Sequence, residues 1–287
     1  MPEAQFTLCD VFATGPLSGN QLAVFVDLVG IATPEMAALS REFNFSEIAF
    51  AGPAVAGEAV PVRIFTPAAE LPFAGHPILG TAAVLARAGG HRTGVAIECG
   101  VGVISCDLDW SDDRTAMVWM RQPVPTVQDF SHAGALCEAL GVSGSSLPVE
   151  IYDNGMAHVY VGLGSEQEVA DLRPDTRALT SLTTEHDVHA GISCFAGSNV
   201  RWKTRMFAPR FGVTEDPATG SAAGPLACHL VRHGLVDLGE MVEIHQGSEL
   251  GRPSLLYAQV FGTDGQISDV RVGGKVQVVG AGTMAWP

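Results

Sequence analysis

A single carboxylate in an apolar segment is the strongest candidate for acid–base chemistry in this sequence. Glu47 is the only charged residue between Glu42 and Glu58, and its neighbours include phenylalanine, isoleucine and alanine. On a strand it would share a face with Phe45 and Ala49. Apolar surroundings raise the pKa of a carboxyl group, which suits general acid–base catalysis near neutral pH. The alternative is an exposed glutamate at a strand end. We favour catalysis, because such flanks rarely surround a purely solvating charge.

Two glycine-containing loops each precede a predicted helix and could hold an anion. Gly75-His76 and Gly220-Ser221 lie at the expected helix starts, where unpaired N–H groups and the helix dipole attract negative charge. Two such starts facing across a cleft would bind a carboxylate. A neutral imidazole at His76 could also donate to a substrate or relay a proton. In the alternative interpretation the glycines only form tight turns and His76 caps its own loop.

Three further patterns bear on binding residues and cofactors. Asp216 could bind an amine or a hydroxyl, or its side chain could bond the following turn. Ser221 has no Ser/His/Asp signature around it, so we interpret it as a binding residue and not as a nucleophile. His229 and His233 have the i, i+4 spacing of a metal pair, but the residues between them lack the glutamate of H-E-x-x-H. No glycine run forms a phosphate loop or a dinucleotide fingerprint. We therefore predict no metal and no organic cofactor.

An internal repeat predicts how these residues are positioned. The segment from Arg63 to Gly89 resembles the segment from Arg205 to Gly234, and in this alignment Gly75 matches Gly220. Each copy reads as strand, glycine-containing loop, helix and strand pair. The helices are predicted to start near Pro77 and Ser221 and to end at the two terminal glycines, which are placed as C-caps. We predict an α+β protein of two similar halves, 1–122 and 123–270, with the C-terminal strand 271–287 joining the first half.

Composition excludes several classes of protein. Of 287 residues, 47% are hydrophobic and 16% are charged, which favours a well-filled interior. The net charge of −15 disfavours nucleic acid and anionic membrane surfaces as partners. Neither a signal peptide nor a membrane-spanning segment is evident. We expect a soluble, cytoplasmic protein whose six cysteines are reduced; none forms a C-x-x-C pair.

Four stretches, in order and over nearly the whole chain, resemble the PhzF family. They are SGNQLAVF from Ser18, NFSE from Asn44, RIFTPAAELPFAGHP from Arg63 and EDPATGSAAG from Glu215. The resemblance implies a diaminopimelate-epimerase-like fold, in which two pseudosymmetric halves each form a curved sheet around a central helix. It also implies a homodimer and a site for a small-molecule carboxylate substrate in the cleft between the halves.

The resemblance also implies roles for individual residues. The related epimerases use one cysteine from each loop, and Ala74 and Thr219 stand at those positions here, which excludes a cysteine-based racemase. The family's catalytic glutamate matches Glu47. Its binding residues match Asn20, Gly75, His76, Asp216, Gly220 and Ser221. The implied activity is cofactor-independent isomerisation of trans-2,3-dihydro-3-hydroxyanthranilate in phenazine biosynthesis, with proton transfer from C3 to C1. A related isomerase or epimerase for another small carboxylate metabolite, or a catalytically silent small-molecule binder, remain alternatives.

Overall fold

Short strands separated by turns dominate the first half of the chain. The computed structural model describes residues 3–263 and 265–286. The strands of this half are β1 (Glu3–Val11), β2 (Asn20–Phe25), β3 (Ile48–Ala51), β4 (Val60–Phe65), β5 (Glu70–Leu71), β6 (Gly94–Cys99), β7 (Gly102–Trp110) and β8 (Thr115–Gln122). Its helices are α1 (Thr33–Phe43) and α2 (Gly75–Ala88). Most residues of α2 are buried, because the strands surround this helix.

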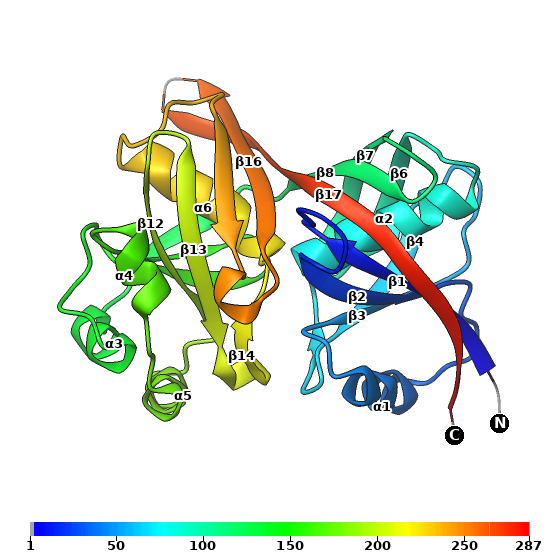
Figure 1. The fold of residues 1–287 in the computed structure, drawn as a ribbon, viewed down its shortest axis with the longest axis horizontal. Helices are drawn as coiled ribbons and strands as arrows, with labels where there is room; N and C mark the ends of the chain where they lie inside the picture. The colour runs from blue at the N-terminus through cyan, green and yellow to red at the C-terminus, as the bar shows by residue number, and fades with distance from the viewer. Residues whose placement is uncertain (1–2, 264, 287) are drawn as a thin grey trace.

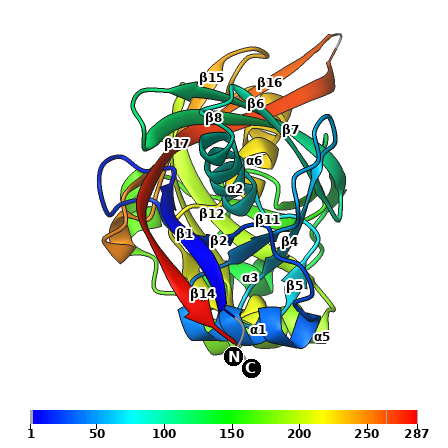
Figure 2. The ribbon, with the colours of Figure 1, turned by 90° about the vertical axis from the view of Figure 1, so that its right-hand side faces the viewer.

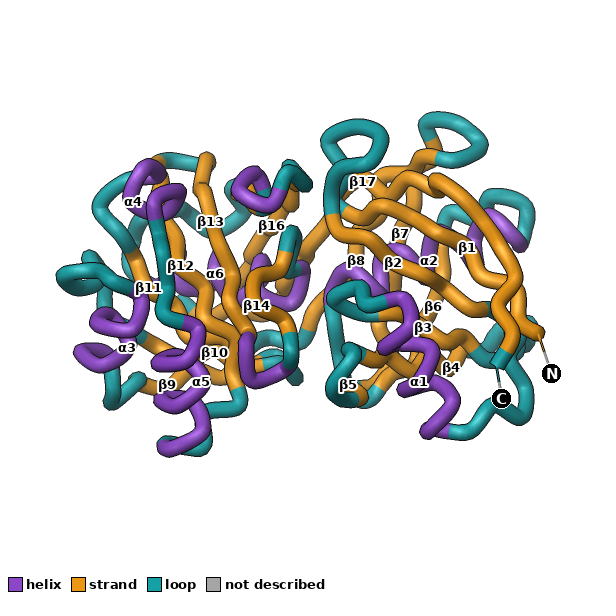
Figure 3. The backbone as a smooth tube through the Cα atoms, turned by 60° about the horizontal axis from the view of Figure 1, so that its bottom comes forward, coloured by secondary structure: helices purple, strands orange, loops and turns teal. Residues whose placement is uncertain are grey.

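The second half uses the same kinds of element. Its strands are β9 (Thr126–Asp129), β10 (Glu150–Asp153), β11 (Ala157–Gly162), β12 (Ala190–Ser198), β13 (Arg201–Ala208), β14 (Val213–Asp216), β15 (Met241–Gln246), β16 (Ser254–Thr263) and β17 (Gln266–Ala285). Its helices are α3 (Ala133–Leu140), α4 (Glu166–Asp171), α5 (Thr176–Glu185) and the largely buried α6 (Gly220–Arg232). Helices α1, α3, α4 and α5 lie on the outside of the molecule (Figure 3).

The two halves repeat one order of strand pairing. In the first half the hydrogen-bonded order of the strands is β1, β2, β3, β4, β6, β7 and β8. The pairs β2–β3 and β4–β6 are parallel. In the second half the order is β10, β11, β12, β13, β15, β16 and β17, and the equivalent pairs β11–β12 and β13–β15 are parallel. The predicted α+β fold of two pseudosymmetric halves, each a curved sheet around a central helix, is confirmed. Figure 2 shows α2 and α6 in the interior, surrounded by strands.

One long strand joins the halves. The first part of β17 pairs with β16, its middle pairs with β8 and its last part pairs with β1, where Ala285 lies opposite Glu3. Figure 1 shows β17 running from one half across to the other. The pairing of β17 with both β8 and β1 closes the strands of the first half into a barrel around α2. The division into 1–122 with 271–287 and 123–270 stays a proposal about domains.

The two central helices begin slightly earlier than predicted. Helix α2 starts at Gly75 and not at Pro77, and α6 starts at Gly220 and not at Ser221. Gly89 caps α2 with a φ of −82°, and the left-handed residue is the next one, Gly90, at +83°. Among the described residues, the helices are all too short or too polar to cross a membrane.

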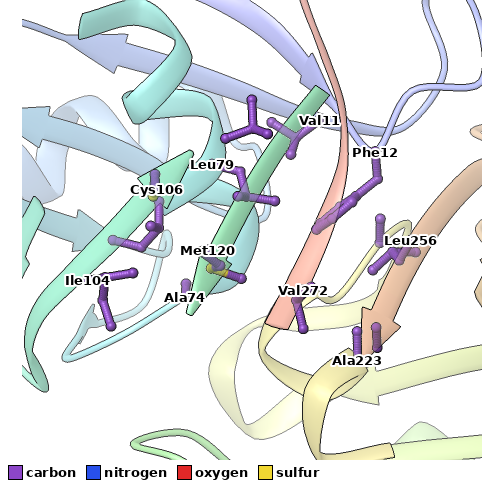
Figure 4. Close-up of a cluster of buried hydrophobic side chains, with 14 of the residues drawn as sticks. Val11, Phe12, Ala74, Leu79, Ile104, Cys106, Met120, Ala223, Leu256 and Val272 are labelled. Atoms are coloured by element: carbon purple, nitrogen blue, oxygen red, sulfur yellow. The ribbon is translucent and has the colours of Figure 1, made fainter. Parts of the chain in front are cut away.

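The hydrophobic core is continuous between the halves. Val272 on β17 is fully buried, and so is Leu79 on α2. They belong to the same buried cluster as Met120 from β8, Ala223 from α6 and Leu256 from β16. Figure 4 shows Leu79 and Met120 on one side of β17 and Ala223 and Leu256 on the other. Because close-packed interiors resist displacement, this core fixes the position of α2 relative to α6.

Candidate active site

The first turns of α2 and α6 contact each other at the boundary between the halves. Gly75 opens α2 and Gly220 opens α6. A Cβ atom on Gly75 would lie 2.5 Å from the carbonyl carbon of Gly220 and 2.6 Å from the backbone nitrogen of Ser221. Only glycine allows backbones to approach this closely. The structure therefore brings the two predicted anion-binding loops together, because each half presents the same helix end to the other.

The Asn20 side chain, at the start of β2, connects the two halves. Its amide nitrogen donates to Oδ1 of Asp216 at 2.8 Å and to the carbonyl oxygen of Ala218 at 2.9 Å. The same nitrogen lies 3.1 Å from Nδ1 of His76. The other ring nitrogen of His76, Nε2, is buried and has no hydrogen-bond partner among the described residues. Burial lowers the pKa of His76 to about 3, so the imidazole is neutral at physiological pH.

Glu47 lies in the loop directly before β3, so its placement on a strand beside Phe45 and Ala49 is wrong. Its side chain is only 14% exposed, and Oε2 lies 3.6 Å from Nδ1 of His76. This oxygen is buried without a hydrogen-bond partner in the part of the chain that the structure describes. Burial raises the pKa of Glu47 well above its usual value, and the negative charge of Asp216 raises it further. Such a carboxyl group can accept and return a proton near neutral pH.

Asp216, the last residue of β14, is buried and held from several sides. Its Oδ2 accepts a hydrogen bond from Oγ1 of Thr219 at 2.6 Å. The side-chain amide of Gln246 donates to the Asp216 carbonyl oxygen at 2.8 Å and to Oγ1 of Thr219 at 3.0 Å. Burial raises the pKa of Asp216 to about 6, although hydrogen bonds from Thr219, Ser46 and Asn20 act to lower it. Asp216 therefore bonds its own turn, as the simpler interpretation held, while remaining beside Glu47.

A pocket between the halves contains both carboxylates in its wall. Its cavity volume is about 30 Å³, so the pocket is narrow in this structure. Polar groups of Glu47, Asp216, Thr219, Ser221 and His158 line it. The apolar part of the wall includes Leu71, Phe73, Met156, Met206 and Phe211. An apolar wall with a few convergent polar groups is typical of a site for a small molecule.

The predicted site residues occupy two layers of this region. Glu47, Asp216 and Ser221 line the pocket. The others stand behind that lining: Asn20, Gly75, His76 and Gly220. His76 is only 2% exposed. Because His76 does not line the pocket, it can act on a ligand only through Glu47 and Asn20, whose side chains lie close to its ring.

Sequence reasoning missed His158, which lies on β11. Its Nε2 lies 3.0 Å from Oγ of Ser221. Burial lowers the pKa of His158 to about 3, so this ring is neutral. Its Nδ1 is buried and has no hydrogen-bond partner within the described ranges. The one available signal was a polar residue inside the apolar segment Ala157–Gly162. His158 orients the Ser221 hydroxyl at the pocket wall.

Two amide side chains that were also missed hold the first turn of α6. Gln122, at the end of β8, donates to the carbonyl oxygen of Gly220 at 2.9 Å. Asn154, in the loop after β10, donates to the carbonyl oxygen of Ser221 at 3.0 Å. Both residues are far from α6 in sequence, so spacing gave no signal for them. Together they fix the position of the α6 start beside the pocket.

The sequence matches one family model and closely similar enzymes over nearly its whole length. Residues 9–282 match the family described as phenazine biosynthesis-like protein. A trans-2,3-dihydro-3-hydroxyanthranilate isomerase from Pseudomonas chlororaphis is 45% identical over 97% of this chain and 98% of its own. The isomerase of the same name from Pseudomonas fluorescens is 46% identical over the same shares.

Solved structures share the architecture described above. A PhzF-family protein from Bacillus anthracis superposes with a TM-score of 0.85 at 21% identity, covering 99% of this chain and 100% of its own. A predicted epimerase from Pseudomonas aeruginosa has a TM-score of 0.84 at 31% identity, covering 98% of this chain and 99% of its own. The predicted diaminopimelate-epimerase-like fold is thereby confirmed.

Proposed function

Because the chain belongs to the phenazine biosynthesis-like family, we propose that it is an isomerase that converts trans-2,3-dihydro-3-hydroxyanthranilate in phenazine biosynthesis. One observation carries the catalytic part of this proposal. The Glu47 carboxyl group lies in the pocket wall with a buried oxygen that no described residue engages. That oxygen is available to a proton on a bound ligand.

Glu47 is proposed to act first as a base and then as an acid. It takes the proton from C3 of the ring and delivers a proton to C1, while the ring double bonds move. Proton and electron pair are conserved within one molecule, so no oxidant or co-reactant enters the step. The enol so formed then tautomerises to a ketone. A carboxyl group whose pKa is raised by burial suits both halves of this transfer.

The surrounding groups are proposed to hold the substrate in register with Glu47. The first turns of α2 and α6 provide N–H groups and positive helix ends for its carboxylate. Asp216 and the Ser221 hydroxyl, which His158 orients, receive its amino and hydroxyl groups.

Family membership supports two further proposals, a homodimer and a cytoplasmic location. Light scattering on purified protein measures the oligomeric state.

Conversion of the substrate in D₂O tests the proposed function. We expect purified protein to consume trans-2,3-dihydro-3-hydroxyanthranilate and to place deuterium on the ring carbon that bears the carboxylate. Deuterium enters C1 when the protonated Glu47 exchanges with D₂O between taking the proton from C3 and delivering one to C1. NMR or mass spectrometry of the product measures the label. Binding without turnover would support a silent binder, and failure to bind would support a different small carboxylate as the substrate.

Asp216→Asn should move the acid limb of the pH profile to lower pH. The base form of Glu47 is needed to begin the reaction, so kcat/KM falls as Glu47 becomes protonated. The charge of Asp216 raises the pKa of Glu47, and removing that charge lowers it. The variant should therefore keep Glu47 ionised at a more acidic pH. Measurement of kcat/KM from acidic to neutral pH locates the limb in each protein.

The matched control for that experiment removes a carboxylate far from the pocket. Asp113 is exposed in the turn between β7 and β8, so Asp113→Asn makes the same chemical change in solvent. Its acid limb should coincide with that of the wild type, because solvent and salt screen exposed charges. An unchanged limb in Asp216→Asn, or a shift to higher pH, would show that Asp216 does not set the ionisation of Glu47.

A further inference from the structure

A second cluster of ionisable side chains lies at the far end of α6. His229 projects from the last turn of this helix, His233 caps its end, and Glu150 begins β10. Oε2 of Glu150 lies 3.1 Å from Nδ1 of His229 and 2.9 Å from Nε2 of His233. One ligand atom from each of the three side chains lies within 4.8 Å of the other two. We propose that Glu150, His229 and His233 form a binding site for a divalent transition metal ion of the zinc class.

The ligand types and their spacing fit such an ion. Two imidazoles and one carboxylate are a common ligand set for zinc, with bonds of about 2.0–2.2 Å and a tetrahedral arrangement. That arrangement places ligand atoms about 3.4 Å apart. The two nitrogen–oxygen distances need to widen by only a few tenths of an ångström to reach it. Glu150, which is distant in sequence, supplies a third ligand beside the pair His229 and His233.

The local surroundings favour a cation at this position. The last turn of a helix carries the negative end of its dipole, which stabilises positive charge. Glu150 is nearly buried, with its side chain 4% exposed. The hydroxyl of Tyr152 donates to Oε2 of Glu150 at 3.0 Å, and an outer partner of this kind fixes the orientation of a ligating carboxylate. The His233 side chain is 18% exposed, so solvent reaches the cluster from that side.

One cation already contacts the cluster and should compete with a metal. Nε of Arg232 lies 3.3 Å from Oε1 of Glu150, whereas both imidazoles approach Oε2. The Arg232 side chain is 55% exposed. It can therefore move into solvent when a metal ion takes the charge of Glu150. Removal of Arg232 should strengthen metal binding.

A metal here would act on stability and not on the proposed proton transfer. Ser221 and His233 lie at opposite ends of α6, about 18 Å apart along the axis at 1.5 Å per residue. An ion bound by Glu150, His229 and His233 would tie the end of α6 to β10. Because it binds the folded chain in preference to the unfolded one, it should raise the temperature of unfolding.

Zinc binding to chelator-treated protein tests the site. We expect about one equivalent of Zn²⁺ to bind by calorimetry, and Co²⁺ to give the intense visible absorption of a tetrahedral complex. His233→Ala should weaken Zn²⁺ binding by more than about tenfold, whereas Arg232→Ala should strengthen it. His245→Ala, which removes a histidine from β15 outside the cluster, should bind as the wild type does. His233 is partly exposed, so its replacement is compatible with folding.

Two outcomes would overturn the proposal. If the wild type binds no Zn²⁺, the cluster is a set of hydrogen bonds that satisfies a buried carboxylate. If His233→Ala binds Zn²⁺ as tightly as the wild type, the ion lies elsewhere on the chain. Chelation should leave substrate turnover unchanged, which separates this site from the proposed function. A turnover lost on chelation and restored by Zn²⁺ would contradict the structural role.

Discussion

Glu47→Gln should reduce turnover by about 10²–10⁴-fold, the contribution typical of a positioned acid–base group. We expect a loss toward the upper end, because the proposed mechanism uses the same carboxyl group as base and as acid. Glutamine keeps the size and shape of the side chain but cannot accept the proton. Substrate binding should persist, since other groups hold the ligand. Steady-state conversion gives the loss in kcat, and calorimetry gives the dissociation constant.

Glu42→Gln is the matched control for this variant. Glu42 lies on α1, only a few residues away, and is exposed, so the same chemical change should leave turnover unaltered. If Glu47→Gln retained near wild-type turnover, Glu47 would not be the proton carrier, and His76 or Asp216 would become the next candidates. Loss of substrate binding together with turnover would instead assign Glu47 to binding.

Stability measurements provide an independent check on the surroundings of Glu47. Burial raises the pKa of this group in the folded protein. Its contribution to stability is therefore present below its ordinary pKa and is lost as the pH rises through the folded value. Glu47→Gln lacks this dependence. The free energy of unfolding of the variant should fall less than that of the wild type as the pH rises.

The sequence identified the groups that carry a local signal. Glu47 stands out because its neighbours are apolar, and the repeat predicts that the starts of α2 and α6 have equivalent surroundings. The motifs of the PhzF family then assigned binding roles to Asn20 and Asp216. Those two residues lie 2.8 Å apart across the halves although 196 positions separate them. The resemblance implied only that both residues belong to one site, because spacing alone does not show which strands become neighbours.

The groups that sequence reasoning missed depend on long-range packing. His158 reaches Ser221 from β11, and Gln122 reaches Gly220 from β8. Neither residue belongs to a short motif with a chemical meaning. The same limit applies to Glu150, whose contact with His229 spans 79 positions. Local apolar periodicity also gave no reason to begin the strand only after Glu47, because the start of β3 at Ile48 is set by its pairing with β4.

Gly75→Ala should lower both stability and turnover, because the new methyl group would meet backbone and not a flexible side chain. Its Cβ would lie 2.5 Å from the carbonyl carbon of Gly220 and 2.6 Å from its Cα. The first turns of α2 and α6 would have to separate. Overpacking typically costs about 1–3 kcal/mol, and a displacement near 1 Å can reduce turnover about 10²-fold. Chemical denaturation and steady-state kinetics measure the two effects.

Gly134→Ala separates this steric effect from the general effect of replacing a helical glycine. Gly134 lies in the first turn of α3, and a Cβ atom there would have no described atom within 4 Å outside the helix and its chain neighbours. Alanine is the better helix former by about 1 kcal/mol, so this control should be as stable as the wild type or more so, with unchanged turnover. If Gly75→Ala behaved like Gly134→Ala, the two helix starts could separate without loss, and their contact would not be what positions the substrate carboxylate beside Glu47. If Gly75→Ala lost turnover but not stability, the contact would serve catalysis alone.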